Sequence, residues 1–148
     1  IASCEKKEAR LLNDLAGTYQ VGQVLLVPEI GADTTLTFSS FLLTFLQCDL
    51  ATSQQGGNCE LAVDSGSAFN LEYGVLKGTG GDDPTLTINP GRGNAAVSET
   101  IEYQLLKSVF TYKIDENTLI MTANARQGIP HRVNGRAYLI KEIIANRR

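Results

Sequence analysis

The chain has 148 residues, the size of a single domain that buries about two-thirds of its unfolded surface. Hydrophobic residues make up 43% and charged residues 20%, which is typical of a folded globular protein and excludes a disordered chain. The formal net charge of −3 provides no electrostatic field for nucleic acid. No apolar run approaches the ~20 residues that a membrane-spanning helix requires. We therefore expect one globular domain with no nucleic-acid partner.

The first four residues, Ile1-Ala2-Ser3-Cys4, have an apolar-small-small-Cys pattern, and charged residues follow at positions 5–10. The pattern resembles the lipobox of bacterial lipoproteins, in which the cysteine is diacylated and becomes the mature N-terminus. The resemblance implies that residues 1–3 are a signal remnant and that Cys4 anchors the protein stably in the cell envelope, on either face of the membrane. The alternative is a buried or spare thiol in an N-terminal helix.

A short helix is predicted over residues 4–15. Ala9, Leu12 and Leu15 fall on one helical stripe, and Gly17 follows as a natural stop. We therefore divide the chain into residues 1–15, which hold the lipobox remnant, the charged tether and the helix, and residues 16–148, a single β domain.

From residue 18 onward, apolar residues alternate with polar ones, which indicates half-buried strands. Gly22 is expected to mark a bulge in the first strand. The segment 41–50 is apolar on both faces, as in a central strand or a surface that contacts a partner. Asp115-Glu116-Asn117 predicts a hairpin turn. Besides 41–50, the predicted strands are 18–27, 34–39, 59–64, 69–75, 86–88, 110–114, 119–121 and 136–143, the last of which either closes the sheet or passes into a short helix.

The segment from Thr100 to Lys107 is ambiguous. Ile101, Tyr103 and Leu105 alternate as in a strand, but Val97, Ile101, Leu105 and Val109 also have helical spacing. We predict a strand because the neighbouring segments are strands. The total of eight or nine short strands separated by turn residues predicts an all-β, antiparallel barrel or sandwich.

If Cys4 is acylated, Cys48 and Cys59 are the two cysteines that remain, and we predict that they form a disulfide. They enclose residues 49–58, and a disulfide that closes so short a loop in an oxidising compartment contributes ~3 kcal/mol to the stability of the fold. The alternative is two reduced thiols packed in the core. A zinc site is not expected, because His131 is the only histidine and lies far away in the sequence.

The segment Leu15-Ala16-Gly17-Thr18-Tyr19, after a short helix, resembles the Gly-x-Trp opening of lipocalins, with Tyr19 in the aromatic position. In its order of elements the chain resembles the lipocalin-like lipoproteins of Bacteroides-type Gram-negative bacteria. The resemblance implies a lipocalin-like barrel with Gly17 and Tyr19 at its closed end. It also implies that a cation from the last strand, Arg136 or Lys141, lies across the Tyr19 ring.

No segment predicts an enzyme, a cofactor or a metal site. The stretch 64–67 lacks the spacing of a nucleophile elbow, and the glycine-rich stretches 78–81 and 91–93 do not lead into a phosphate-binding helix. His131 is expected in a surface loop, and Asp82-Asp83 in a solvated turn, because two carboxylates fall short of a calcium site.

The predicted inward side chains include many aromatic rings, which either fill the barrel or line a cavity for one small ligand. Two functions follow: a lipid-anchored protein that binds a small hydrophobic or amphipathic molecule in the barrel, or an envelope lipoprotein with a filled barrel that contacts other proteins. The candidate cavity residues are Phe38, Phe69, Tyr73, Tyr103, Phe110 and Tyr112.

Overall fold

The computed structural model describes residues 2–48, 59–90, 100–125 and 130–148, with the backbone alone described for residues 2–8 and for residue 90. The elements, in chain order, are α1 (Ala2–Leu15), β1 (Gly17–Val27), β2 (Thr34–Phe45), β3 (Cys59–Asp64), β4 (Ala68–Leu76), β5 (Thr85–Pro90), α3 (Ile101–Leu106), β6 (Ser108–Asp115), β7 (Thr118–Asn124), β8 (His131–Val133), β9 (Arg136–Tyr138) and β10 (Ile140–Arg147).

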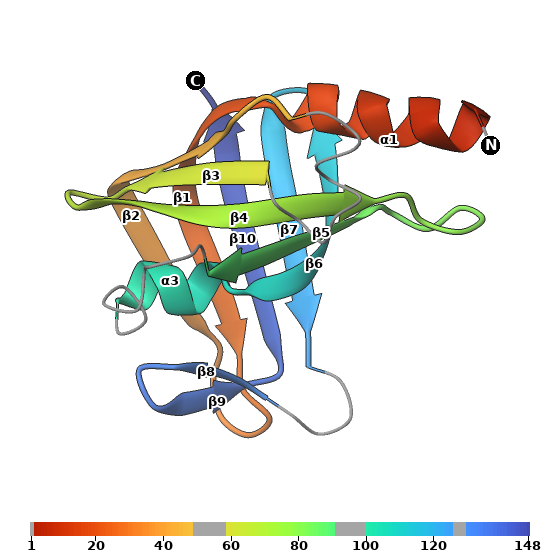
Figure 1. Ribbon diagram of the computed structural model, residues 1–148. Coiled ribbons are helices and arrows are strands. Elements are labelled where there is room, and N and C mark those ends of the chain that lie inside the picture. The colour runs from red at the N-terminus through yellow and green to blue at the C-terminus, as the bar shows by residue number, and fades with distance from the viewer. Residues whose placement is uncertain (1, 49–58, 91–99, 126–129) are drawn as a thin grey trace.

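Eight strands close into an antiparallel barrel in the order β1-β10-β7-β6-β5-β4-β3-β2, which confirms the predicted fold class (Figure 1). Neighbours in the barrel are neighbours in the sequence, except that β10 pairs with β7 on one side and with β1, the first strand, on the other. The short hairpin β8–β9 lies between those two strands in the chain and forms a separate two-stranded sheet. Closure gives every barrel strand two partners, so the barrel presents no edge strand for aggregation.

One end of the barrel is covered by α1 and the other by α3 and the β8–β9 hairpin (Figure 1). We call them the closed end and the α3 end. The closed end also holds the beginning of β1 and the end of β10, which pair antiparallel, so the C-terminus lies beside α1. The helix α1 predicted over residues 4–15 is confirmed. In the described part of the chain, no helix is long and apolar enough to cross a membrane.

The inward side chains of the strands form a single core. The alternation of buried and half-buried residues along β1 shifts at Gly22, where the register with both neighbouring strands slips, as a bulge requires. The predicted run 34–39 and the first part of the run 41–50 belong to one long strand, β2, which ends at Phe45; residues 46–48 are not in a strand, and residues 49–50 lie outside the described residues. The fully buried large side chains include Tyr19, Phe41, Phe45, Tyr73 and Phe110.

The predicted strand over 100–107 is wrong, because residues 101–106 form the helix α3. Thr100 caps this helix: its hydroxyl oxygen accepts a hydrogen bond from the backbone N–H of Tyr103 at 3.3 Å. Leu105 and Leu106 are buried against the core, whereas Ile101 is only half-buried. The single run predicted over 136–143 is also divided, because residues 136–138 form β9 and residues 140–147 form β10.

Candidate ligand pocket at the closed end

The closed end is built around Tyr19, as the sequence predicts. Gly17 has a φ of +137°, a backbone conformation that other residues rarely adopt, and it carries the chain from α1 into β1. Tyr19 is fully buried two residues later, and its hydroxyl donates a hydrogen bond to the Leu15 carbonyl at 2.9 Å. The Tyr19 ring also meets the Phe45 ring edge-to-face, with 5.8 Å between centroids. These contacts tie the end of α1 to the first barrel strand.

The cation over Tyr19 is Arg147, and the prediction of Arg136 or Lys141 is wrong. The Arg147 guanidinium lies 5.0 Å from the Tyr19 ring centroid and donates hydrogen bonds to the Tyr19 hydroxyl and, at 2.5 Å, to the Asp14 carbonyl. The reason is the strand register. β1 and β10 are antiparallel and Tyr19 pairs with Arg147, so the start of β1 meets the last residues of β10. Arg136 belongs to β9, and Lys141 pairs with Leu26 near the α3 end.

Three tyrosines, Tyr19, Tyr73 and Tyr112, gather beneath the closed end. The Tyr73 hydroxyl donates to the Leu46 carbonyl at 2.6 Å, and burial raises the pKa of Tyr73 to about 12. Burial also raises the pKa of Tyr112, with a further contribution from the charge of Asp14 and from both other tyrosines. These phenols therefore stay protonated and act as hydrogen-bond donors at neutral pH.

The Tyr112 hydroxyl differs from the other two because it is buried without any hydrogen-bond partner among the described residues. Only 3% of the residue is exposed. An unpartnered buried hydroxyl costs about 1–3 kcal/mol, and native proteins contain few of them. Such a donor indicates a place where a polar group of another molecule would be stabilised.

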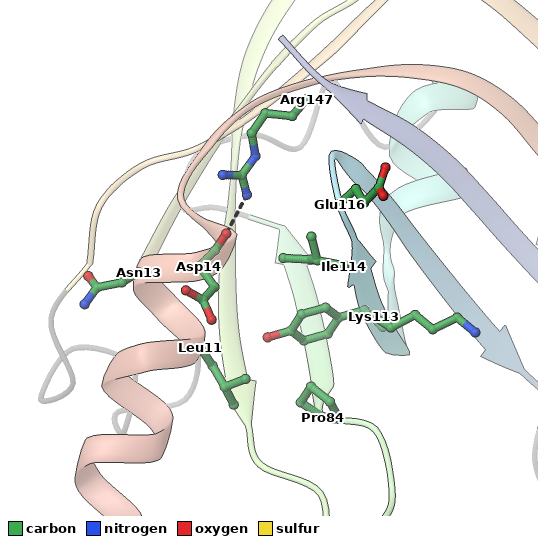
Figure 2. A pocket seen from close by; sticks show the side chains of 9 residues that line it. Leu11, Asn13, Asp14, Pro84, Lys113, Ile114, Glu116 and Arg147 are labelled. Carbon is green, nitrogen blue, oxygen red and sulfur yellow. Dashed lines mark hydrogen bonds between the residues drawn. The ribbon is translucent and has the colours of Figure 1, made fainter.

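Tyr112 lines a pocket of about 520 Å³ between the last turn of α1 and the rim of the barrel (Figure 2). This volume lies within the range of small-molecule sites. The apolar part of its wall comes from Leu11 on α1, Pro84 before β5 and Ile114 on β6. Polar side chains complete the lining: Asn13, Asp14, Lys113, Glu116 and Arg147.

Figure 2 shows Leu11 and Pro84 at the lower end of this space and Ile114 in its middle, with Arg147 above and Asp14 on the helix side. A site of this kind can bind a molecule with an apolar body and a charged or polar group. Its lining contains no histidine, cysteine or serine. In the described part of the chain, no group of three or more His, Cys, Asp or Glu side chains is placed to hold a metal ion.

The other predicted cavity residues are not gathered in this pocket. Phe110 is fully buried in the core, whereas Phe38 and Phe69 are half-buried and pack against it. The Phe38 ring meets Phe41 edge-to-face at 5.0 Å. The prediction that Tyr103 projects inward from a strand is wrong, because it lies on α3 beneath the Lys107 ammonium, 5.9 Å from its ring centroid.

A second polar cluster lies at the α3 end, around the buried Lys141. The Lys141 ammonium donates to the carbonyls of Gln104 at 3.0 Å and Lys107 at 3.5 Å, and lies 5.7 Å from the Phe110 ring centroid. Burial lowers the pKa of Lys141 to about 8. His131 lies in β8 and is half-buried, not in a surface loop as predicted. Burial and the charge of Lys141 lower the pKa of His131.

The predicted disulfide is present: Cys48 and Cys59 are bonded, with 5.6 Å between their Cα atoms. It joins the segment after β2 to the first residue of β3, close to the Tyr73 hydrogen bond with Leu46. The intervening segment 49–58 lies outside the described residues. The predicted acylation concerns the Cys4 side chain, which is likewise outside them.

Sequence reasoning missed Arg147 and the pocket itself. One signal was present: in an antiparallel barrel whose first and last strands pair, the residue opposite the start of the first strand must come from the end of the chain. Arg147 and Arg148 are the adjacent basic pair there. The pocket had no comparable signal, because its lining comes from α1, β6, the end of β10 and two connecting segments, which lie far apart in the sequence.

Comparison with known proteins gives no relative: no protein-family model, no curated protein and no solved structure matches the chain.

Proposed function

We propose that this chain is a lipid-anchored protein of the cell envelope that binds a small amphipathic molecule in the closed-end pocket, and that it is not an enzyme. The observation that carries the binding role is the buried, unpartnered hydroxyl of Tyr112 in the wall of a pocket of about 520 Å³. Apolar side chains and both signs of charge surround it, which suits an amphipathic ligand.

The barrel interior is a weaker candidate for the ligand site. Tyr19, Tyr73 and Phe110 are buried to 0% exposure and, with Lys141, occupy the space in which an interior ligand would lie. An eight-stranded barrel is just wide enough to be filled by such side chains. The packed interior is also compatible with the alternative role, a filled barrel that contacts envelope proteins. In that role, exposed apolar residues such as Ile30, Leu76 and Val109 would make the contacts.

The binding proposal is tested by nuclear magnetic resonance titration of the ¹⁵N-labelled chain with single-chain amphiphiles below their micelle concentration. We expect amide shifts in the last turn of α1 and along β6. Ile114→Arg, which places a charged side chain in the pocket, should abolish them. Val109→Arg is the matched control, because it adds the same charge to the same strand at an exposed position outside the pocket. Shifts that survive Ile114→Arg, or that appear only at the α3 end, would contradict the assignment.

The anchoring proposal rests on the Ile1-Ala2-Ser3-Cys4 pattern and is tested separately. Metabolic labelling of the full-length protein with an alkyne fatty acid should tag it, and Cys4→Ala should abolish the tag. Native mass spectrometry of protein purified from its source membrane would then identify a co-purified ligand. Label retained by Cys4→Ala would exclude this residue as the site of acylation.

A further inference from the structure

The closed-end pocket lies on the element that carries the proposed lipid anchor. Leu11, Asn13 and Asp14 of its lining belong to the last turns of α1, and Cys4 is near the beginning of the same helix. Leu11 is seven positions after Cys4, which corresponds to about 10 Å along a helix. If Cys4 is acylated, the pocket is therefore held within reach of the lipids that surround the anchor.

Four charged side chains line the pocket, two of each sign. Arg147 and Lys113 are positive, whereas Asp14 and Glu116 are negative, and all four are exposed. Figure 2 shows Arg147 and Asp14 on the α1 side of the pocket and Glu116 on the β6–β7 side, whereas the Lys113 ammonium points away from these three groups. A ligand with a single charge would be attracted by one sign and repelled by the other, whereas a zwitterion can place each of its charges near the opposite sign. The charge pattern thus favours a ligand with an anionic and a cationic group.

The Arg147 guanidinium is already oriented by the structure. Its hydrogen bonds to the Tyr19 hydroxyl and the Asp14 carbonyl fix it at the rim, and its planar fork suits the oxygens of a phosphate. The Tyr112 hydroxyl, a donor without a partner, supplies one more group for a phosphate or ester oxygen. The anionic part of the ligand is accordingly expected near Arg147 and Tyr112.

The cationic part of the ligand is expected to be a primary ammonium group. Carboxylates such as Asp14 and Glu116 accept hydrogen bonds from N–H groups, which a primary ammonium has and a quaternary ammonium lacks. Quaternary ammonium groups are bound by cages of aromatic rings, and Tyr112 is the single aromatic residue among the nine that line this pocket. The lining therefore discriminates between ethanolamine and choline headgroups.

We propose that the closed-end pocket binds the phosphoethanolamine headgroup of a membrane phospholipid, with its phosphate at Arg147 and Tyr112 and its ammonium at Asp14 and Glu116. This inference rests on the proposed binding function and names the ligand class of the same pocket. Occupancy would dock the closed end onto the bilayer beside the anchor and fix the orientation of the barrel at the membrane surface.

Calorimetric titration of the full chain carrying Cys4→Ala tests the headgroup. The probes are dihexanoyl phosphatidylethanolamine, the matching phosphatidylcholine and phosphatidylglycerol, and glycerophosphoethanolamine, which has no acyl chains. We expect the ethanolamine lipid to bind about tenfold more tightly than the other two lipids, the effect of one good charge-assisted hydrogen bond. Glycerophosphoethanolamine should bind more weakly than the lipid, because it lacks contacts with the apolar wall.

Variants then assign the two halves of the headgroup. Asp14→Asn should remove the preference for ethanolamine over choline. Arg147→Lys, which keeps the charge but loses the planar fork, should weaken the binding of both lipids equally. Glu60→Gln, an exposed carboxylate on β3 outside the pocket, is the matched control and should change neither. All three substituted side chains are exposed, so their loss leaves the core intact.

The outcomes separate the two proposals. Equal affinity for the ethanolamine and choline lipids would overturn the headgroup assignment but leave amphiphile binding in place. Glycerophosphoethanolamine binding as tightly as the lipid would indicate a soluble ligand and overturn membrane docking. If none of the four probes binds and the titration with single-chain amphiphiles also fails, both the inference and the proposed function are wrong.

Discussion

The two ends of the barrel handle polar groups in opposite ways. At the closed end, the charge of Arg147 stays at the solvent-exposed rim and reaches inward only through hydrogen bonds and the face of Tyr19. At the α3 end, the ammonium of Lys141 lies inside the core, 1% exposed, with backbone carbonyls as its acceptors. A rim cation keeps its hydration, whereas a buried one loses it, so the closed end should be the more stable and less pH-sensitive end.

Tyr19→Ala should have the largest effect, because it removes the side chain on which the closed end depends. Truncating a fully buried aromatic costs ~3–5 kcal/mol, a large part of the 5–15 kcal/mol that typically stabilises a domain. The midpoint of urea unfolding should fall sharply. Tyr19→Phe keeps the ring but loses the hydrogen bonds to Leu15 and Arg147, so it should lower the midpoint much less. A midpoint of Tyr19→Ala equal to that of the wild type would mean that this end contributes little.

Removal of the disulfide should destabilise the closed end next. Replacing Cys48 and Cys59 together by serine frees a short loop in the unfolded chain and should cost ~3 kcal/mol. Adding a reductant to the wild type should have the same effect, while the double variant should not respond to it. Hydrogen exchange should show that the backbone amides of β2 and β3 lose their protection first. A wild-type midpoint unchanged by complete reduction would contradict this prediction.

The α3 end should determine how stability depends on pH. The pKa of Lys141 is about 8 in the folded protein and 10.5 in an unfolded chain. Below pH 8 the amine is charged in both states, so the folded state bears the full cost of burying that charge. Above pH 8 the unfolded chain holds a proton that the folded protein lacks, so stability should increase, by about 2 kcal/mol between pH 8 and 10.

Above pH 10 the trend should reverse, because unfolded tyrosines lose their protons while Tyr73, with a pKa of about 12, keeps its own. Lys141→Met should abolish the rise between pH 8 and 10 and leave the fall above it. The measurement is the urea midpoint as a function of pH for both proteins. A wild-type curve that is flat from pH 8 to 10 would place the Lys141 amine in water.

The sequence predicts the barrel well where a strand has one wet and one buried face. Leu71 and Tyr73 in β4 alternate with polar residues, and that periodicity alone identifies the strand. The periodicity fails at residues 101–106, where Ile101 and Leu105 fit both periods and the deciding contact is the cap formed by Thr100. The local pattern does not contain the partner of Tyr19 either, since Arg147 is 128 residues away and only barrel closure brings the two together.

The smallest and most specific prediction compares two tyrosines of the closed end. Tyr73→Phe removes a hydroxyl that donates to the Leu46 carbonyl, so it should destabilise the protein by about 1 kcal/mol. Tyr112→Phe removes a buried hydroxyl that has no partner, so it should stabilise the free protein by about the same amount. For a chain of this length, each change corresponds to roughly 2–4 °C in Tm, in opposite directions.

The same pair of variants connects stability with the pocket. If the Tyr112 hydroxyl is a donor for a ligand, Tyr112→Phe should raise the Tm of the free protein and at the same time weaken ligand binding, a combination that a purely structural tyrosine does not produce. Tyr73→Phe should lower the Tm and leave binding unchanged, because Tyr73 does not line the pocket. Calorimetric scans with and without ligand measure both quantities. A loss of stability in ligand-free Tyr112→Phe would show that the hydroxyl already has a partner in solution, and the pocket would then lose the donor on which its function is argued.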